Sequence, residues 1–146
     1  MTTAPTPSRY GAVAQLLHWT IAALIVVQFV LANLADDAPS KMQQLALLTR
    51  HKSFGMTVLM LAVVRLLWRL THPAPELPAG MKRHERMLAK LTHLAFYVLL
   101  VAVPLAGWLM SSARGFTVSW FDLFSWPNLI GKDQANYEML KETHEA

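Results

Sequence analysis

The feature that most constrains this chain is a run of 26 residues, from Tyr10 to Ala35, that contains no Asp, Glu, Lys or Arg. A helix needs about 20 consecutive apolar residues to cross the hydrocarbon core of a bilayer, so this run is long enough to span. A secretory signal peptide would have a shorter apolar region, of about 7–15 residues. Only 15% of the chain is charged and 54% is hydrophobic, which is typical of a membrane protein. We therefore predict a first membrane-spanning helix over about residues 11–34.

Two further spans follow. The second is predicted over about residues 45–70, because the long basic side chains near its ends can keep their charges at the membrane surface. It stops before the sequence THPAPELPAG, where three prolines and a glycine cannot continue a helix. The third is predicted over about residues 90–113, since Leu91–Ala113 carries no charge. The fold class is therefore all-α, a transmembrane helix bundle with three spanning helices.

The segments outside the spans are predicted from composition. Residues 1–9 are expected to form a disordered cytoplasmic tail. The aromatic sequence GFTVSWFDLFSWPNLIG, broken by Asp122 and Pro127, is too irregular to span and is expected to form a loop at the lipid–water boundary. Residues 136–146 have the composition of the beginning of a fourth helix.

Composition also excludes several kinds of site. The chain contains no cysteine, which rules out disulfides, covalently attached haem, iron–sulfur clusters and thiolate zinc sites. The three spans contain no Asp or Glu for a proton relay, and no HExxH motif is present for zinc. The basic residues are bunched between the second and third spans, which indicates membrane topology with a cytoplasmic N-terminus rather than nucleic-acid binding.

The histidines are the candidate functional residues: His18, His51, His72, His84, His93 and His144. His72 and His84 lie in or beside the proline-rich linker and are expected to be solvated. Ionisable groups deep in a membrane are costly and usually functional, which favours a cofactor or proton role for His18. Taken alone, His51 and His93 could equally be ordinary polar residues, and for His144 the ordinary interpretation is favoured.

Single histidines on separate membrane helices suit a non-covalent b-type haem. Its iron accepts two axial imidazoles, and each must be neutral with its other nitrogen hydrogen-bonded. The haem carboxylates need cations, and Arg50, Lys52, Arg65 and Arg69 lie at suitable depths. For each of these cations the alternative is simple anchoring at the membrane interface.

Five segments, in this order, resemble the bacterial cytochrome b561 family: RYGAVAQLLHWTIAALIV, RHKSFGMTVLMLAVVRLLWRL, LTHLAFYVLLVAVPLAGWLMSS, RGFTVSWFDLF and the terminal THEA. The hydrogenase-type cytochrome b subunits are more distant kin. The resemblance covers nearly all of the chain after residue 8. It implies a four-helix membrane bundle, formed here by residues 10–146, with two b haems stacked across the bilayer.

The resemblance also implies roles for individual histidines. It makes His18 a ligand of the inner haem, His51 and His144 the ligand pair of the outer haem, and His93 a contact of an inner quinone pocket. The sequence departs from the family because it stops at Ala146, whereas the partner of His18 is expected about four helical turns after His144. We therefore expect a chain truncated before most of the fourth helix, in which the inner haem has one ligand.

The function that the resemblance implies is electron transfer between the outer face of the bacterial inner membrane and the quinone pool, with ubiquinone as acceptor. One branch of the family resembles superoxide oxidase, in which superoxide gives its electron to the outer haem. The alternative is a haem b anchor subunit of a partner oxidoreductase such as a hydrogenase. Membrane lipid is an expected partner, and a homodimer is a further possibility. A haem-free membrane scaffold is the third interpretation.

Overall fold

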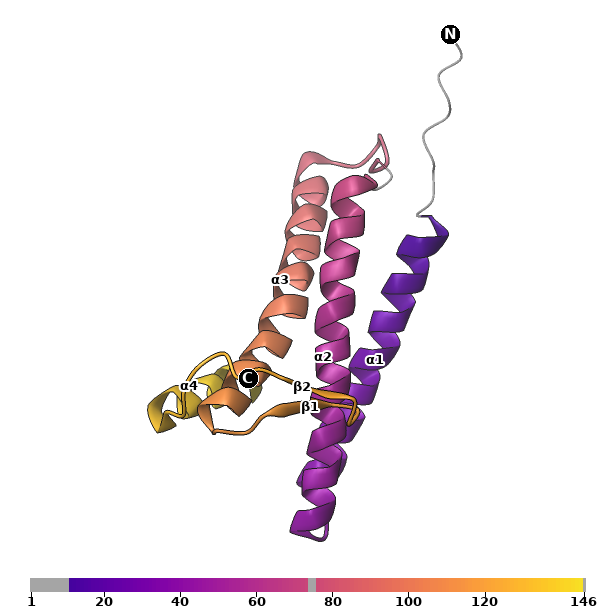
Figure 1. Cartoon of the computed structure of the whole chain (residues 1–146). Helices are drawn as coiled ribbons and strands as arrows, with labels where there is room; N and C mark the ends of the chain where they lie inside the picture. Colours follow the sequence, from indigo (N-terminus) through magenta and orange to yellow (C-terminus); the bar gives the residue numbers. More distant parts are fainter. Residues whose placement is uncertain (1–10, 74–75, 146) are drawn as a thin grey trace.

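The computed structural model describes residues 11–73 and 76–145, so the predicted tail over residues 1–9 lies outside the described part. Figure 1 shows the long helices side by side, with a small hairpin and a short helix in the lower part of the bundle, above the turn that joins the first two helices. The elements are α1 (Ala12–Asp36), α2 (Lys41–Thr71), α3 (Arg83–Ala113), β1 (Val118–Trp120), β2 (Phe124–Trp126) and α4 (Gln134–Glu145). We call the end that carries β1, β2 and α4 the hairpin end, and the opposite end, with residues 72–82, the linker end.

Helices α1, α2 and α3 are each long and apolar enough to cross a membrane, which confirms the predicted transmembrane bundle. Their large apolar side chains face outward: Trp19, Phe29 and Leu70 each expose about two thirds or more of their surface. Small residues fill much of the interior, namely Ala35, Ala62, Ala106, Ala113, Ser53, Ser111 and Ser112. This inside-out pattern suits lipid, because small residues let membrane helices approach closely while lipid chains solvate the apolar exterior.

Helices α1 and α2 form an antiparallel pair joined by a short turn. Helix α2 begins at Lys41, four residues before the predicted start of the span. The reason is a side-chain cap, since the hydroxyl of Ser40 accepts a hydrogen bond from the backbone N–H of Gln43 at 3.2 Å. The helix therefore begins at its N-terminal cap, before the apolar run starts.

Helix α3 also begins earlier than predicted, at Arg83 rather than near residue 90. The carboxylate of Glu85 accepts a hydrogen bond from the backbone N–H of Lys82 at 2.9 Å, which caps the first turn. The guanidinium of Arg86 donates to the carbonyls of Pro78 and Ala79, so the linker is fastened to the same turn. Charged residues thus form the first two turns of the helix outside the apolar segment.

The aromatic segment after α3 is a β-hairpin, and the prediction of a loop was wrong there. Strands β1 and β2 are antiparallel, with Val118 opposite Trp126 and Trp120 opposite Phe124. The turn places Phe121 and Asp122 at φ values of 48° and 58°, in the left-handed region that non-glycine residues rarely adopt. Contacts from α2, described below with Ser53, hold this turn in place.

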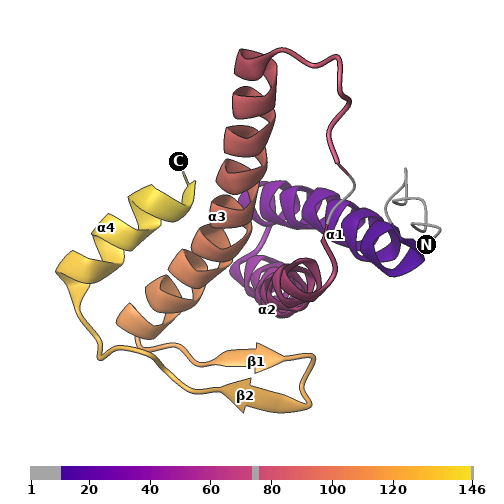
Figure 2. The ribbon, with the colours of Figure 1, turned by 90° about the horizontal axis from the view of Figure 1, so that it is seen from above.

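Helix α4 lies across the lower half of α3 and begins at Gln134 (Figure 2). The carboxylate of Asp133 caps it by accepting hydrogen bonds from the N–H groups of Ala135 and Asn136. The backbone N–H of Asp133 in turn donates to the carbonyl of Ala113, at the end of α3. The start of α4 is therefore tied to the end of α3, and the helix runs back toward α2.

Candidate functional site

His51 lies on α2 at the hairpin end and is half-buried against α1. Its Nδ1 donates a hydrogen bond to the backbone carbonyl of Gln28 at 3.2 Å. One turn further along α2, Gly55 allows the side-chain amide of Gln28 to approach so closely that a Cβ on Gly55 would lie 2.8 Å from Nε2. The side-chain oxygen of Gln28 is buried without a hydrogen-bond partner.

His144 reaches the same region from the last turn of α4. Its Nδ1 donates to the backbone carbonyl of Val103 on α3, at 2.8 Å. The imidazole rests directly on Gly107 of α3, where a Cβ would lie only 2.8 Å from Cε1 of the ring. A glycine is therefore needed at position 107 for the imidazole to occupy this position.

The rings of His51 and His144 are neighbours in an edge-on arrangement, with centroids 6.2 Å apart and planes at 87°. A carbonyl oxygen can only accept, so each Nδ1 carries the ring proton, and a neutral ring then has an unprotonated Nε2. A metal–imidazole bond is about 2.0–2.1 Å long, so two imidazoles on opposite sides of one metal ion have centroids roughly 6 Å apart. With this spacing and these tautomers, and with the glycine under His144, the two imidazoles are the residues that would hold a haem iron.

The second group of candidates surrounds a cavity of about 310 Å³ toward the linker end, between α1, α2 and α3. His18, Arg65, His93 and Tyr97 are its polar lining residues, beside apolar side chains such as Phe96. His18 lies ten residues before Gln28 on α1, so this cavity and the His51–His144 pair are about 15 Å apart along the helix axis.

The two histidines of this cavity have different proton positions. The guanidinium of Arg65 donates to Nδ1 of His18 at 3.2 Å, and an arginine has no acceptor atom. A neutral His18 therefore carries its proton on Nε2. His93 donates from Nδ1 to the carbonyl of Ala89 at 2.7 Å, which leaves its Nε2 unprotonated. Of these two, only His93 presents a free nitrogen lone pair on Nε2.

The cationic candidates are divided between the two ends. Arg65 and Arg69 both lie over the ring of Tyr97, at 5.3 and 5.8 Å from its centroid. At the hairpin end, Arg50 is exposed, and the ammonium of Lys52 lies 5.4 Å from the centroid of Phe116.

The linker histidines take no part in either group. The ring of His72 stacks on Trp68 with centroids 3.8 Å apart, and His84 is exposed. Both therefore lie at the surface of the linker end. Among residues 11–73 and 76–145, no three His, Asp or Glu side chains are close enough together to hold a metal ion by themselves.

Reasoning from the sequence missed the residues that position the histidines. Gln28 and Val103 act through backbone carbonyls, which every residue has, so no sequence signal singles them out. Gly107 could have been noticed as a glycine inside a spanning helix, where close approach of another group is a common reason for it. Ser53, two residues after His51, was also missed: its buried hydroxyl accepts from the N–H of Phe121 and lies 3.0 Å from the carbonyl of Ser119.

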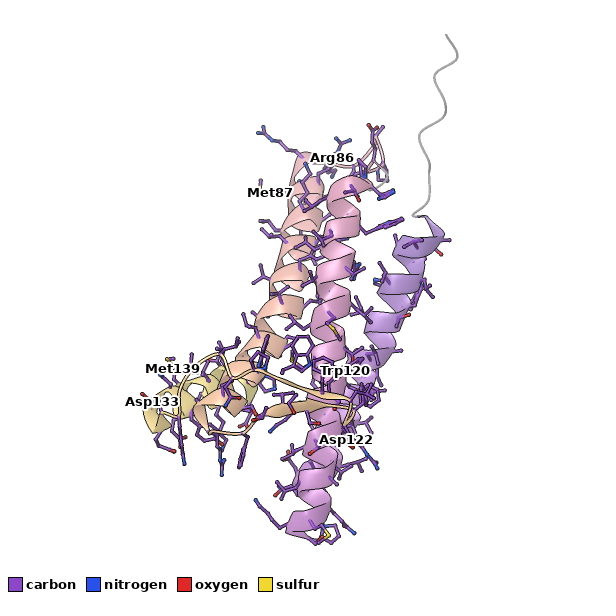
Figure 3. The ribbon with its side chains drawn as sticks, in the orientation of Figure 1. Arg86, Met87, Trp120, Asp122, Asp133 and Met139 are labelled. Atoms are coloured by element: carbon purple, nitrogen blue, oxygen red, sulfur yellow. The ribbon has the colours of Figure 1, made fainter. Side chains whose placement is uncertain are left out.

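Ser53 attaches the hairpin beside the histidine pair. Four residues further along α2, the hydroxyl of Thr57 accepts a hydrogen bond from the indole of Trp120 at 3.0 Å. Figure 3 shows Trp120 lying against α2, with Asp122 close to the same helix. The ring of Phe121 packs edge-on against Phe54 at 5.1 Å. The hairpin thus covers the stretch of α2 that follows His51.

Comparison with known proteins gives the family. A family model described as "Prokaryotic cytochrome b561" matches residues 9–146. This chain belongs to the prokaryotic cytochrome b561 family. Cytochrome b561 homolog 2 of Escherichia coli (strain K12) is 31% identical over 145 residues, which are 95% of this chain and 74% of that protein. Probable superoxide oxidase CybB of Yersinia pestis is 26% identical over 123 residues, which are 84% of this chain and 67% of that protein.

Membership of the cytochrome b561 family confirms the resemblance seen in the sequence. The chain is a bacterial membrane protein of an electron-transfer family, and the family implies binding of haem b. Membership of the family therefore implies that this cytochrome b561 protein has a site for haem b.

Proposed function

We propose that this chain holds haem b between His51 and His144 and uses it to transfer electrons across the hairpin end of the bundle. The observation that carries the proposal is the 6.2 Å spacing of two perpendicular imidazoles whose Nδ1 atoms are both bonded to backbone carbonyls. Haem iron held by two imidazoles gains and loses single electrons and has no open position for oxygen. The chain's own backbone carbonyls hold both rings with the proton on Nδ1, which leaves each Nε2 free.

Cations near the pair would hold the carboxylates of the haem. Arg50 is adjacent to His51 and exposed, with no partner in the described part of the chain, so we assign this role to Arg50 first. Lys52 is the second candidate, although its ammonium already lies over Phe116. Gln28 has a buried side-chain oxygen without a partner beside the pair and could accept a hydrogen bond from a water or ligand there.

The test is a reduced-minus-oxidised visible spectrum of the purified protein together with a count of haem per chain. We expect His51→Ala and His144→Ala each to abolish the same spectral component. His72→Ala is the matched control, because His72 stacks on Trp68 away from the pair. An unchanged spectrum in either ligand variant contradicts the proposal.

The cavity toward the linker end supports a second redox site. His18 is our proposed ligand of a second haem, and His93 our proposed contact for a quinone such as ubiquinone. The roughly 15 Å between His18 and the His51–His144 pair fits two cofactors placed one above the other along α1. To bind a metal through Nε2, His18 must carry its proton on Nδ1 instead. Arg65, which donates to Nδ1 here, would then have to move away from the ring.

Orientation follows from charge. The linker end carries Arg65, Arg69, Lys82, Arg83, Arg86 and Lys90. We propose that this end and the N-terminus face the cytoplasm of a bacterial inner membrane, by the positive-inside rule. The His51–His144 pair would then lie near the outer face and the cavity near the inner face.

The electron donor distinguishes two forms of this function. Because one relative is named a probable superoxide oxidase, we propose superoxide as the donor at the hairpin end and ubiquinone as the acceptor. The alternative is an anchor subunit that receives electrons from a partner oxidoreductase such as a hydrogenase. The exposed aromatic surface of the hairpin, where Phe121 and Phe124 expose 40% and 48% of their areas, is the observation that favours a docked partner.

A purified preparation separates the two forms. If the chain alone oxidises superoxide in the presence of ubiquinone, superoxide is the donor. If electrons reach the quinone only after a partner oxidoreductase is added, the chain is an anchor subunit. If the His51→Ala variant still passed electrons to ubiquinone, the electrons would not pass through the proposed site. That result would overturn both forms of the function.

A further inference from the structure

Two cations at the hairpin end share one aromatic ring. The ammonium of Lys52, on α2, lies 5.4 Å from the centroid of Phe116, and the guanidinium of Arg114, directly after α3, lies 5.8 Å from it. In the part of the chain that the structure describes, no carboxylate lies within ion-pair distance of either cation. Both cations lie around one ring without a counter-charge, so an anion that contacts both would be bound favourably.

Arg114 is held in a defined position. Its Nη1 donates a hydrogen bond of 2.6 Å to the hydroxyl of Tyr137 on α4, and its guanidinium lies 4.9 Å from the centroid of the Tyr137 ring. A guanidinium has five N–H donors, so others remain for a ligand. Beside it, the aliphatic part of the Lys132 side chain packs over Gly115, where a Cβ would lie 3.4 Å from Cδ.

The cluster lies at the depth of a membrane interface. Trp108, Trp120 and Trp126 gather in the hairpin and the end of α3, and tryptophan favours the headgroup level of a bilayer. The surroundings are apolar yet exposed: Phe116 exposes 50% of its area and Leu129 exposes 43%. A ligand here would therefore meet positive charge and an apolar surface together.

We propose that Lys52 and Arg114 bind the phosphate group of an anionic phospholipid, whose acyl chains lie along the apolar side chains around Phe116. Phosphate oxygens accept hydrogen bonds from both an ammonium and a guanidinium, and a guanidinium can bind two of them at once. The apolar surroundings favour a lipid over free phosphate, which has no part to place against them. The site uses Lys52, the second candidate for the haem carboxylates, and so leaves that role to Arg50; it does not otherwise depend on the proposed haem function.

The test is thermal unfolding of the whole chain, purified in a neutral detergent, with added phosphatidylglycerol, phosphatidylcholine or inorganic phosphate. Phosphatidylglycerol should raise Tm by several degrees, because a ligand that binds only the folded state stabilises it. Phosphatidylcholine and inorganic phosphate should give no comparable shift. The variant Lys52→Gln/Arg114→Gln should lose the shift, and Lys41→Gln/Arg83→Gln, which removes two charges elsewhere, should keep it.

Three results overturn the proposal. An equal shift with inorganic phosphate would show a site for free anions, an equal loss in the control would show a non-specific charge effect, and a retained shift in Lys52→Gln/Arg114→Gln would place the lipid elsewhere. Should the double variant not fold, Arg114→Gln serves instead, since Arg114 is exposed. Native mass spectrometry should then detect at least a several-fold loss of bound phosphatidylglycerol relative to the wild type, and undiminished binding refutes the site.

Discussion

The imidazole of His144 rests on the backbone of α3 at Gly107, and this contact brings it to within 6.2 Å of the His51 ring. Each of the two rings is fixed by a different neighbouring helix, His51 by α1 through Gln28 and His144 by α3 through Val103. The pair therefore depends on all four helices of the described chain. Any change that moves one helix away from the others should therefore change the spacing of the two rings.

Gly107→Ala tests the contact under His144 directly. The new Cβ would lie 2.8 Å from Cε1 of the imidazole, so the ring must move away from Gly107 and lose its hydrogen bond to Val103. We expect at least a several-fold loss of the haem signal assigned to His51 and His144, and a loss of stability of about 1–3 kcal/mol from overpacking. The measurements are the reduced-minus-oxidised spectrum and Tm.

The control for this variant is Gly131→Ala, because a Cβ at Gly131 meets no atom within 4 Å. It should leave both the spectrum and Tm unchanged. If Gly107→Ala also retained its full haem content, the close approach of the ring to Gly107 would be unimportant for binding.

Gln28→Met separates the two roles of Gln28. The backbone carbonyl that fixes His51 is unaffected by the substitution, whereas the buried side-chain oxygen without a partner is removed. Leaving such a polar atom unpaired costs about 1–3 kcal/mol, so the haem-free chain should become more stable by up to that amount. A rise in Tm with an unchanged His51 environment is the expected result, with the exposed Gln43→Met as control. A fall in Tm would mean that the amide oxygen has a partner that it needs.

The spans could be predicted from the sequence because each contains a long run without charge. The ends of α2 and α3 could not, since a charge-free window detects only the part buried in lipid. The helices continue into water until a cap ends them, at Ser40 for α2 and at Lys82 with Glu85 for α3. Local hydrogen bonds rather than hydropathy set these boundaries.

The hairpin was unpredictable for a different reason. A tight turn with two residues at positive φ is ordinarily recognised by Gly or Asn, whereas here Phe121 and Asp122 occupy it. Its stability comes from Ser53 and Thr57, more than sixty residues earlier in the chain. The histidines, in contrast, were candidates by residue type and position, and the family resemblance supplied their pairing. The carbonyls that set their tautomers belong to the fold and have no sequence signal.

Arg65→Met tests the difference between His18 and the histidine pair. Arg65 donates to Nδ1 of His18, so in the haem-free chain His18 should carry its proton on Nε2, whereas His51 and His144 should carry theirs on Nδ1. Removing the guanidinium should abolish the preference of His18 for a proton on Nε2. The tautomers of His51 and His144 should stay unchanged. Nitrogen-15 chemical shifts of the imidazoles report the tautomers. Arg69→Met, which removes a neighbouring cation that also lies over Tyr97, is the control.

Ser53→Ala tests the attachment of the hairpin to α2. The buried hydroxyl accepts from the N–H of Phe121 at 3.1 Å and lies 3.0 Å from the carbonyl of Ser119, so its removal takes a partner from two partly buried backbone groups. It also removes support from the turn at Phe121 and Asp122, whose positive φ values cost free energy.

We expect hydrogen exchange over residues 118–126 to become about ten- to a hundredfold faster, which corresponds to a loss of about 1–3 kcal/mol in local stability. Exchange in α1 should be unaffected. Ser125→Ala is the matched control, because Ser125 lies on β2 of the same hairpin and is exposed. If Ser53→Ala left the exchange of the hairpin unchanged, the aromatic contact between Phe121 and Phe54 would be sufficient to hold it against α2.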